Sequence, residues 1–211
     1  MPDSAQTHEY ARLRLAAGAV YQSGEAPSML SLGWANDVLK FWFDEAGSDR
    51  WFAKDASFDD TVLRRFRAVH EALATCDNDL LLVDPRTALA AVIVLDQMSR
   101  NMFRDTPSAF ATDGRALTIA QQAIAKEFDV ALSKDERMFL YLPFEHAENA
   151  EAQERCVTLM ATLDDPELVK WADAHRSIIV RFGRFPHRNR VLGRTSTPEE
   201  TDFLLQPDSS F

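Results

Sequence analysis

Residues 84–100 read DPRTALAAVIVLDQMSR, and this stretch decides the fold class. Asp84 is a typical N-cap residue and Pro85 suits the first turn, so the pair favours the start of a helix. The helix starts apolar on every side, from Ala88 to Leu95, and a helix that is hydrophobic all round is buried. The sequence therefore predicts a helix from Ala88 to about Arg100 at the centre of a helical bundle.

The segments around this helix repeat apolar residues at helical spacing. Capping boxes at Ser133 and Thr197 and an N-cap at Asp165 predict further helix starts. Pro143 and Gly183 predict helix ends. The first predicted helix starts at Trp34, and the others cover residues 58–73, 88–100, 108–126, 134–142, 148–163, 166–182 and 198–205. Gly114 weakens the prediction for residues 108–126. No segment shows a persuasive strand alternation, so the class is all-α, with about eight or nine helices joined by short turns.

The chain of 211 residues divides by composition into an extension and one domain. Residues 1–30 are predicted to be an extension, with a helix over 10–21 and a linker over 23–28, and residues 31–211 a single all-helical domain. The formal net charge of −10 disfavours binding to nucleic acid and to anionic membranes. Neither a membrane-spanning run nor a signal-peptide pattern is present, and the two cysteines are far apart. We therefore expect a cytoplasmic protein.

Residues 176–194, RSIIVRFGRFPHRNRVLGR, contain six arginines, one histidine and no acid. A cationic segment in an acidic chain needs either an anionic ligand or internal carboxylate partners. The arginine fork suits a phosphate or a carboxylate, whereas Asp96, Glu145 and Glu148 are candidate internal partners. Phenylalanines between the arginines resemble a stacking platform for nucleic acid, but the acidic net charge argues against that function. Both the ligand and the internal pairing remain open at this point.

The end of the central helix, residues 95–104, carries a second group of polar side chains. Asp96, Arg100 and Arg104 are four apart and share one helix face. They could form i,i+4 ion pairs with one another on the surface of the helix. Alternatively, a buried helix delivers these groups, with Asn101, to a pocket, because buried charges need a partner or a ligand.

The third polar segment is Glu145-His146-Ala147-Glu148. It lacks the paired histidine spacing of a metal site, so no metal is predicted. A histidine held by a carboxylate is the simpler interpretation, and such a pair can also serve as a general acid or base. His175 lies on an apolar helix face, where a satisfied core histidine is the more common case. The sequence contains neither a glycine-rich phosphate loop nor a convincing nucleophile motif.

With these residues in place, the chain resembles a bacterial family of domains of unknown function, DUF924. The resemblance covers about Trp34 to Leu205. It rests on the strings VLKFWF (38–43), RWFAKD (50–55), LDQ (95–97), RNMFR (100–104), AFATD (109–113), YLPFEH (141–146), QER (153–155), RFGRFPHRN (181–189) and STPEE (196–200).

The resemblance implies stacked antiparallel helix pairs, similar to a tetratricopeptide-repeat array, and brings no activity, substrate or cofactor. Two positions depart from the family pattern. Met98-Ser99 replaces Phe-Pro, and His146-Ala147-Glu148-Asn149 replaces His-Ser-Glu-Asp. A mechanism that needs a hydroxyl at 147 or a carboxylate at 149 is therefore in doubt for this chain.

Two functions follow from these patterns. The first is a pocket that binds a small anionic molecule, with or without turnover, and without a cofactor. Its candidate catalytic residues are His146, His187 and Glu148. Its candidate binding residues are Asp96, Arg100, Asn101, Arg104, His146, His175, Arg181, Arg184, His187 and Arg188. The alternative is a scaffold that clamps a peptide, in which the same residues form a structural network.

Overall fold

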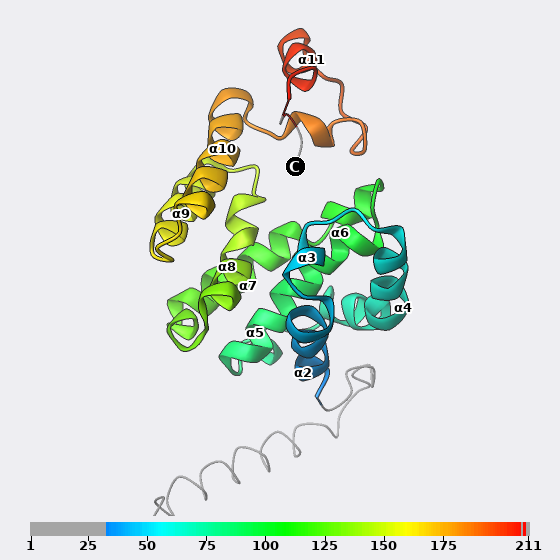
Figure 1. Ribbon diagram of the computed structural model, residues 1–211, viewed down its shortest axis with the longest axis vertical. Coiled ribbons are helices and arrows are strands. Elements are labelled where there is room, and N and C mark those ends of the chain that lie inside the picture. Colours follow the sequence, from blue (N-terminus) through cyan, green and yellow to red (C-terminus); the bar gives the residue numbers. More distant parts are fainter. Residues whose placement is uncertain (1–32, 208, 210–211) are drawn as a thin grey trace, which may run out of the picture. The chain divides into compact units, whose positions relative to one another are not determined.

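The computed structural model describes residues 33–207 and residue 209 (Figure 1). These residues all belong to one compact unit, Gly33–Phe211. The predicted extension at residues 1–30, with its expected helix and linker, lies outside the described residues.

The described residues form helices and contain no strand, so the all-α prediction is confirmed. Among the described residues, the uninterrupted α and π runs number nine when the 3-10 turns are left out, in agreement with the expected number. In chain order the α and π segments are α2 (Trp34–Leu39) with η1 (Lys40–Ala46), α3 (Ser48–Trp51), α4 (Ala56–Leu73), α5 (Pro85–Val92) with η3 (Ile93–Met98) and α6 (Ser99–Met102), α7 (Asp113–Ala125), α8 (Lys134–Glu145), α9 (Ala150–Ala161), α10 (Pro166–Phe182) and α11 (Pro198–Leu204). Short 3-10 turns are η2 (Asn78–Leu80), η4 (Pro107–Phe110), η5 (Phe128–Ala131) and η6 (Pro186–Arg188).

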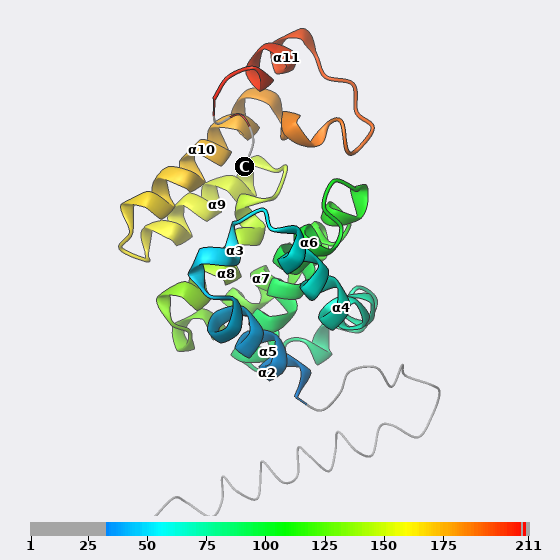
Figure 2. The same cartoon turned by 45° about the vertical axis from the view of Figure 1, so that its right-hand side comes forward.

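The predicted central helix is the continuous run α5–η3–α6. Every residue from Ala88 to Ser99 is buried, as a helix that is apolar on all sides requires. Helices α2, α7 and α8 pack against its first half, and α4 packs against η3 and α6. Figure 2 shows these helices gathered around it. The middle of the run widens into the π segment Ile93–Met98, and such π turns are frequent at functional sites.

The local signals for helix starts act as predicted. The Asp84 carboxylate accepts a hydrogen bond from the Thr87 amide at 2.9 Å. Complete capping boxes form at Ser133 and at Thr197. Gly183 ends α10 with φ of 70°, a left-handed conformation that glycine adopts without steric cost.

Two predicted boundaries are wrong. Residues 108–112 do not belong to a long helix, because Pro107 starts a separate 3-10 turn and α7 begins only at Asp113. Pro143 does not end α8, which continues to Glu145. A proline in the last turn removes only one backbone hydrogen bond, and the His146 amide still bonds to the Leu142 carbonyl at 3.0 Å.

Helices α8, α9 and α10 form consecutive hairpins. Four residues join α8 to α9, four join α9 to α10, and each pair packs together, so neighbouring helices run antiparallel. Figures 1 and 2 both show α9 and α10 side by side. Within the described part of the chain, no helix combines the length and the apolar character needed to cross a bilayer.

Candidate functional site

The π segment brings a buried carboxylate to the centre of the site. In this wider helical segment, the backbone carbonyls of Leu95 and Asp96 accept hydrogen bonds from side chains. The Thr112 hydroxyl donates to the Leu95 carbonyl at 2.6 Å, and Arg100 donates to the Asp96 carbonyl. Because Thr112 precedes α7, this contact also fixes the start of α7 beside the π segment.

The Asp96 carboxylate is fully buried and surrounded by donors. Gln97 Nε2 donates to Oδ2 at 2.6 Å, and Arg100 Nη1 lies 3.2 Å from Oδ1. His146 Nδ1 lies 2.9 Å from both carboxylate oxygens. Burial alone would raise the pKa of Asp96, but Arg100, His146 and Gln97 together hold it well below its ordinary value. Asp96 is therefore ionised.

His146 follows the last turn of α8 and faces Asp96 through one edge of its ring. Burial, followed by the positive charge of Arg100, lowers the pKa of His146 in spite of the neighbouring Asp96. The imidazole is thus neutral near pH 7. An ionised carboxylate accepts but does not donate, so Nδ1 carries the hydrogen and Nε2 carries the lone pair.

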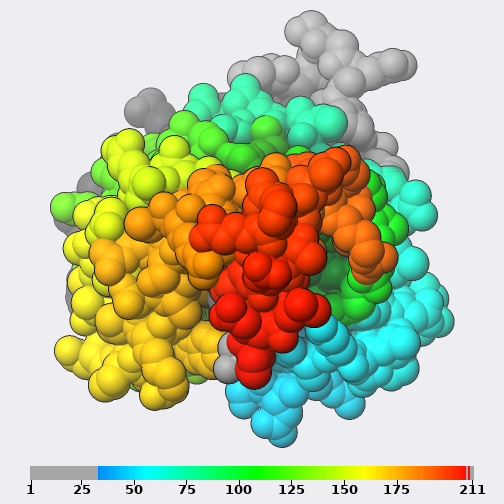
Figure 3. Space-filling view, turned by 90° about the horizontal axis from the view of Figure 1, so that it is seen from above, coloured from blue at the N-terminus to red at the C-terminus, as the bar shows by residue number. Residues whose placement is uncertain are grey.

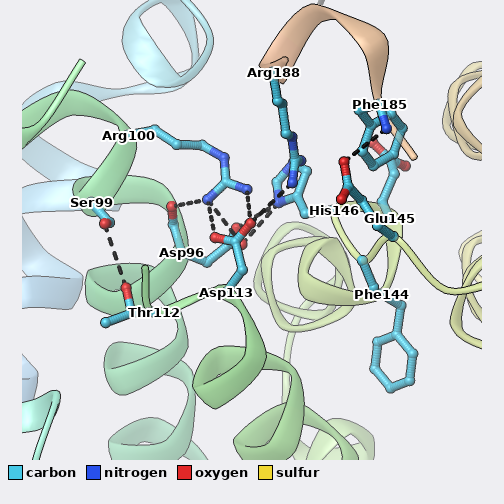
Figure 4. A network of polar contacts seen from close by, with 12 residues as sticks. Asp96, Ser99, Arg100, Thr112, Asp113, Phe144, Glu145, His146, Phe185 and Arg188 are labelled. Carbon is cyan, nitrogen blue, oxygen red and sulfur yellow. Dashed lines mark hydrogen bonds and ion pairs between the residues drawn. The ribbon is translucent and has the colours of Figure 1, made fainter. Parts of the chain in front are cut away.

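Asp113 lies between two guanidinium groups (Figure 4). Arg100 donates to both of its carboxylate oxygens at 3.0 Å, and Arg188 Nη1 reaches Oδ2 at 3.3 Å. Burial and the charge of Asp96 nevertheless raise the pKa of Asp113. Arg100 comes from α6 and Arg188 from η6, so this carboxylate joins two distant parts of the chain.

Arg188 is a buried cation with unused donors. Its guanidinium lies over the rings of Phe185 and Phe110, 4.5 and 4.7 Å from their centroids, and the residue is 6% exposed. Burial and the charge of Arg100 lower the pKa of Arg188 to about 10, which leaves it charged at neutral pH. Its Nε atom is buried without a hydrogen-bond partner among the described residues.

Glu148, in the turn between α8 and α9, holds the loop that carries Arg188. It accepts from the Phe185 amide at 2.8 Å and from both terminal nitrogens of Arg194 at 2.6 and 2.9 Å. Burial would raise the pKa of Glu148, but these donors outweigh it and lower the value. Arg194 also donates to the Phe185 carbonyl at 3.0 Å, which closes the loop on itself.

Of these groups, Asp113, His146, Glu148 and Arg188 line a concavity of about 400 Å³ that is open to solvent. One part of its wall is polar and the other is apolar. In Figure 3 the orange residues of the loop after α10 and green residues that precede α7 border a hollow. The lining residues are Pro107, Phe110, Ala111, Asp113, Gly114, Leu117, His146, Ala147, Glu148, Asn149, Arg188 and Leu192.

Some of the predicted site residues lie at the pocket and others do not. His146, Glu148 and Arg188 line it, and Asp96 and Arg100 contact these residues or Asp113 from behind. Asn101 and Arg104 do not line it. Both donate to Asp59 on α4, Asn101 at 2.8 Å and Arg104 at 2.6 and 2.9 Å. The predicted i,i+4 ladder thus forms between Asp96 and Arg100 and stops there.

Carboxylates partner the arginines of residues 176–194. Arg181 bonds to Glu199 and Arg184 to Glu200, both away from the pocket. Of the acids considered from the sequence, only Glu148 pairs with this segment. The remaining ion pairs are Arg176 with Glu154 and Asp173, Arg188 with Asp113, Arg190 with Asp105, and Arg194 with Glu148.

The other two candidate histidines lie behind the pocket wall. The His175 ring contacts Phe185, and its Nδ1 lies 2.9 Å from the Trp171 carbonyl. Burial lowers the pKa of His175 to about 3, and burial together with Arg188 lowers that of His187 to about 4. Both are neutral at pH 7, and neither lines the concavity.

Glu145 belongs to a separate buried cluster. It lies 3.5 Å from His175 Nδ1 and 3.9 Å from Cys156 Sγ. Burial and Asp96 raise the pKa of Glu145 to about 8, so it is protonated at neutral pH. Glu145 and Glu148 therefore face different neighbours, and within the described residues no group of three or more potential ligands is arranged to hold a metal ion.

Sequence reasoning did not select Asp113 or Phe110 as site residues. Asp113 is the first residue of α7, where the helix dipole stabilises a negative charge. An acid at this position is therefore expected in any helix and does not by itself indicate a site. Its pairing with Arg188, 75 residues away, depends on the fold. The one available indication in the sequence was a charged residue, Asp113, at the start of a partly buried helix.

The fold and site define an all-helical protein with a small pocket built around a buried carboxylate, a histidine and arginines. The chain belongs to the family of bacterial proteins of unknown function DUF924, whose model matches residues 38–208. It is similar to the solved structure of ATU0120, a protein of unknown function from Agrobacterium tumefaciens, with 45% identity and a TM-score of 0.77. That match covers 81% of this chain and 96% of the other. No curated protein matches the chain.

Proposed function

We propose that this protein binds a small molecule through a carboxylate or phosphate group placed against Arg188. The observation that carries the proposal is the unused hydrogen-bonding capacity of this buried guanidinium. An arginine has five N–H donors, whereas Arg188 makes one contact of 3.3 Å with Asp113 and leaves Nε without a partner. Burying polar donors without acceptors is costly, and an anion in the pocket would provide acceptors.

The rest of the pocket supports a small ligand with an apolar part. Phe110, Leu117 and Leu192 contribute apolar surface to the same wall. A volume of about 400 Å³ lies within the range of pockets that hold small molecules, near its lower end. The phenylalanine rings on the guanidinium keep it in place, so little side-chain freedom is lost on binding.

Calorimetric titration with inorganic phosphate and with succinate tests this proposal. Arg188→Lys keeps the positive charge but loses the planar fork, and we expect it to weaken the binding of the preferred anion about tenfold, or roughly 1.4 kcal/mol. Arg184→Lys is the matched control, because Arg184 is in the same segment but bonds to Glu200 outside the pocket. We expect that control to bind within a factor of two of the unmodified protein.

Either of two outcomes would refute the proposal. One is that neither anion binds at millimolar concentration. The other is that Arg188→Lys and Arg184→Lys change the affinity equally, since the anion would then respond to general charge and not to this pocket. Far-ultraviolet circular dichroism of each variant establishes that the helical fold is retained.

A tetratricopeptide-like array that clamps a peptide is the second candidate. The consecutive antiparallel hairpins of α8, α9 and α10 support it, as do the exposed Trp171 and Val180 on α10. Affinity capture from a lysate, followed by calorimetry with the recovered peptide segment, tests this function. Binding that survives Arg188→Lys and is lost on Trp171→Ala would favour the scaffold over the small-molecule pocket.

A further inference from the structure

We infer that the pocket is a hydrolytic site in which His146, oriented by Asp96, removes a proton from the water that attacks an ester of an anionic molecule. This inference rests on the proposed function, because Arg188 would hold the anionic end of that molecule. It adds a reaction class and assigns one role to each of three residues.

The contact between Asp96 and His146 has the geometry of a general base and its orienting group. Both Asp96 oxygens lie 2.9 Å from Nδ1, so the carboxylate fixes the ring and the tautomer. The ring contacts Asp96 through Nδ1 and so has Nε2 on its other edge, and His146 lines the pocket. The same division of roles between an acid and a histidine occurs in hydrolases on unrelated folds.

The pocket wall indicates that water is the nucleophile. Its lining contains no serine, threonine, cysteine or lysine. The two carboxylates in the wall are occupied, Asp113 by Arg100 and Arg188, and Glu148 by Arg194 and the Phe185 amide. The pocket opens to solvent, so water can reach His146.

Arg188 and His146 line the same pocket, and in Figure 4 both lie above the carboxylates of Asp96 and Asp113. The two functional residues come from different elements, His146 from the end of α8 and Arg188 from η6. A molecule whose carboxylate contacts Arg188 would thus place an ester a few bonds away within reach of a water on Nε2. This proximity selects a short anionic ester.

The reaction is balanced with water as the co-reactant. His146 Nε2 takes a proton as the water oxygen bonds to the acyl carbon, and the carbonyl electron pair moves to its oxygen. That pair then re-forms the carbonyl, the bond to the leaving alcohol oxygen breaks, and this oxygen takes the proton from Nε2. One water is consumed, a carboxylic acid and an alcohol are released, and His146 returns to its neutral form.

Mono(4-nitrophenyl) succinate is a suitable probe, because it carries a carboxylate and releases coloured 4-nitrophenolate. We expect His146→Gln to lower kcat/KM about 100-fold, the lower end of the usual contribution of a general base. His70→Gln is the matched control, a buried histidine on α4 that does not line the pocket, and it should retain activity. Neutral 4-nitrophenyl acetate should be cleaved less efficiently than the succinate ester, and Arg188→Lys should reduce that preference.

Asp96 is a positioning residue, so its test uses the pH profile. The charged and titratable groups around His146 are Asp96, Arg100, Asp113, His175, His187 and Arg188. We expect the rate to rise as His146 loses its proton and to level off below pH 7. Asp96→Asn removes the nearest negative charge, so kcat should fall and this rise should move to lower pH with little change in KM. A purely structural role for Asp96 would not move the rise.

The outcomes separate this inference from the proposed function. If succinate binds but the succinate ester is not hydrolysed, or His146→Gln hydrolyses it as fast as the unmodified protein, the inference is wrong and the anion site stands. If neither phosphate nor succinate binds, the proposed function fails first. Hydrolysis that depends on both His146 and Arg188 supports the two together.

Discussion

The effect of replacing Glu145 by glutamine on the free energy of unfolding should depend on the pH. The Glu145 carboxyl is buried beside His175 and Cys156, and burial together with Asp96 raises its pKa from 4.5 to about 8. The folded protein therefore keeps this carboxyl protonated at pH values where the unfolded chain ionises it. Stability from the protonated form is complete below pH 4.5 and is lost as the pH rises through 8.

The size of the effect follows from these two pKa values. Ionisation in the unfolded chain alone costs the fold about 1 kcal/mol at pH 5 and about 3 kcal/mol at pH 7. Glutamine has almost the same shape and does not ionise. We therefore expect the stability of Glu145→Gln relative to the unmodified protein to increase by about 2 kcal/mol between pH 5 and pH 7.

Urea unfolding at both pH values measures this change. Comparing two pH values cancels the fixed cost of altering the contact with Cys156. Glu151→Gln, an exposed position on the neighbouring helix α9, is the control and should show a much smaller change. If the stability difference between Glu145→Gln and the unmodified protein is the same at pH 5 and pH 7, the carboxyl is not held protonated and the reasoning is wrong.

Three further predictions concern stability. Asp84→Ala removes the cap on the Thr87 amide and should lower the free energy of unfolding by about 1 kcal/mol, measured with urea. Glu148→Ala removes the acceptor of the Phe185 amide, so this amide should exchange with deuterium faster, whereas unchanged exchange would contradict the role of Glu148 in holding the loop. His175 has a folded pKa of about 3 against 6.5, so acid protonates the unfolded chain first. From pH 7 to pH 5 the unmodified protein should lose about 2 kcal/mol relative to His175→Gln in urea unfolding, and an equal loss in both proteins would contradict this.

Features that depend on near neighbours in the chain could be predicted from the sequence. Helix caps at Asp84 and Thr197 bond to amides three residues away, so a short motif contains the whole interaction. The burial of residues 88–95 follows from their composition, because an all-apolar helix cannot face water. The polar groups at the end of that helix are unusual for the same reason, and His146 is recognised by the carboxylates beside it in the sequence.

Tertiary structure alone decided which charges far apart in the chain meet. Arg104 bonds to Asp59 and Arg188 to Asp113, 45 and 75 residues away. An acidic chain offers many carboxylates, and their sequence positions do not distinguish one partner from another. The π segment around Asp96 and the start of α7 at Asp113 place the Asp113 carboxylate between Arg100 and Arg188. The sequence by itself therefore determined the helices, their caps and the buried centre, while only the packing of α6, α7, α8 and the loop after α10 decided that a pocket forms between them.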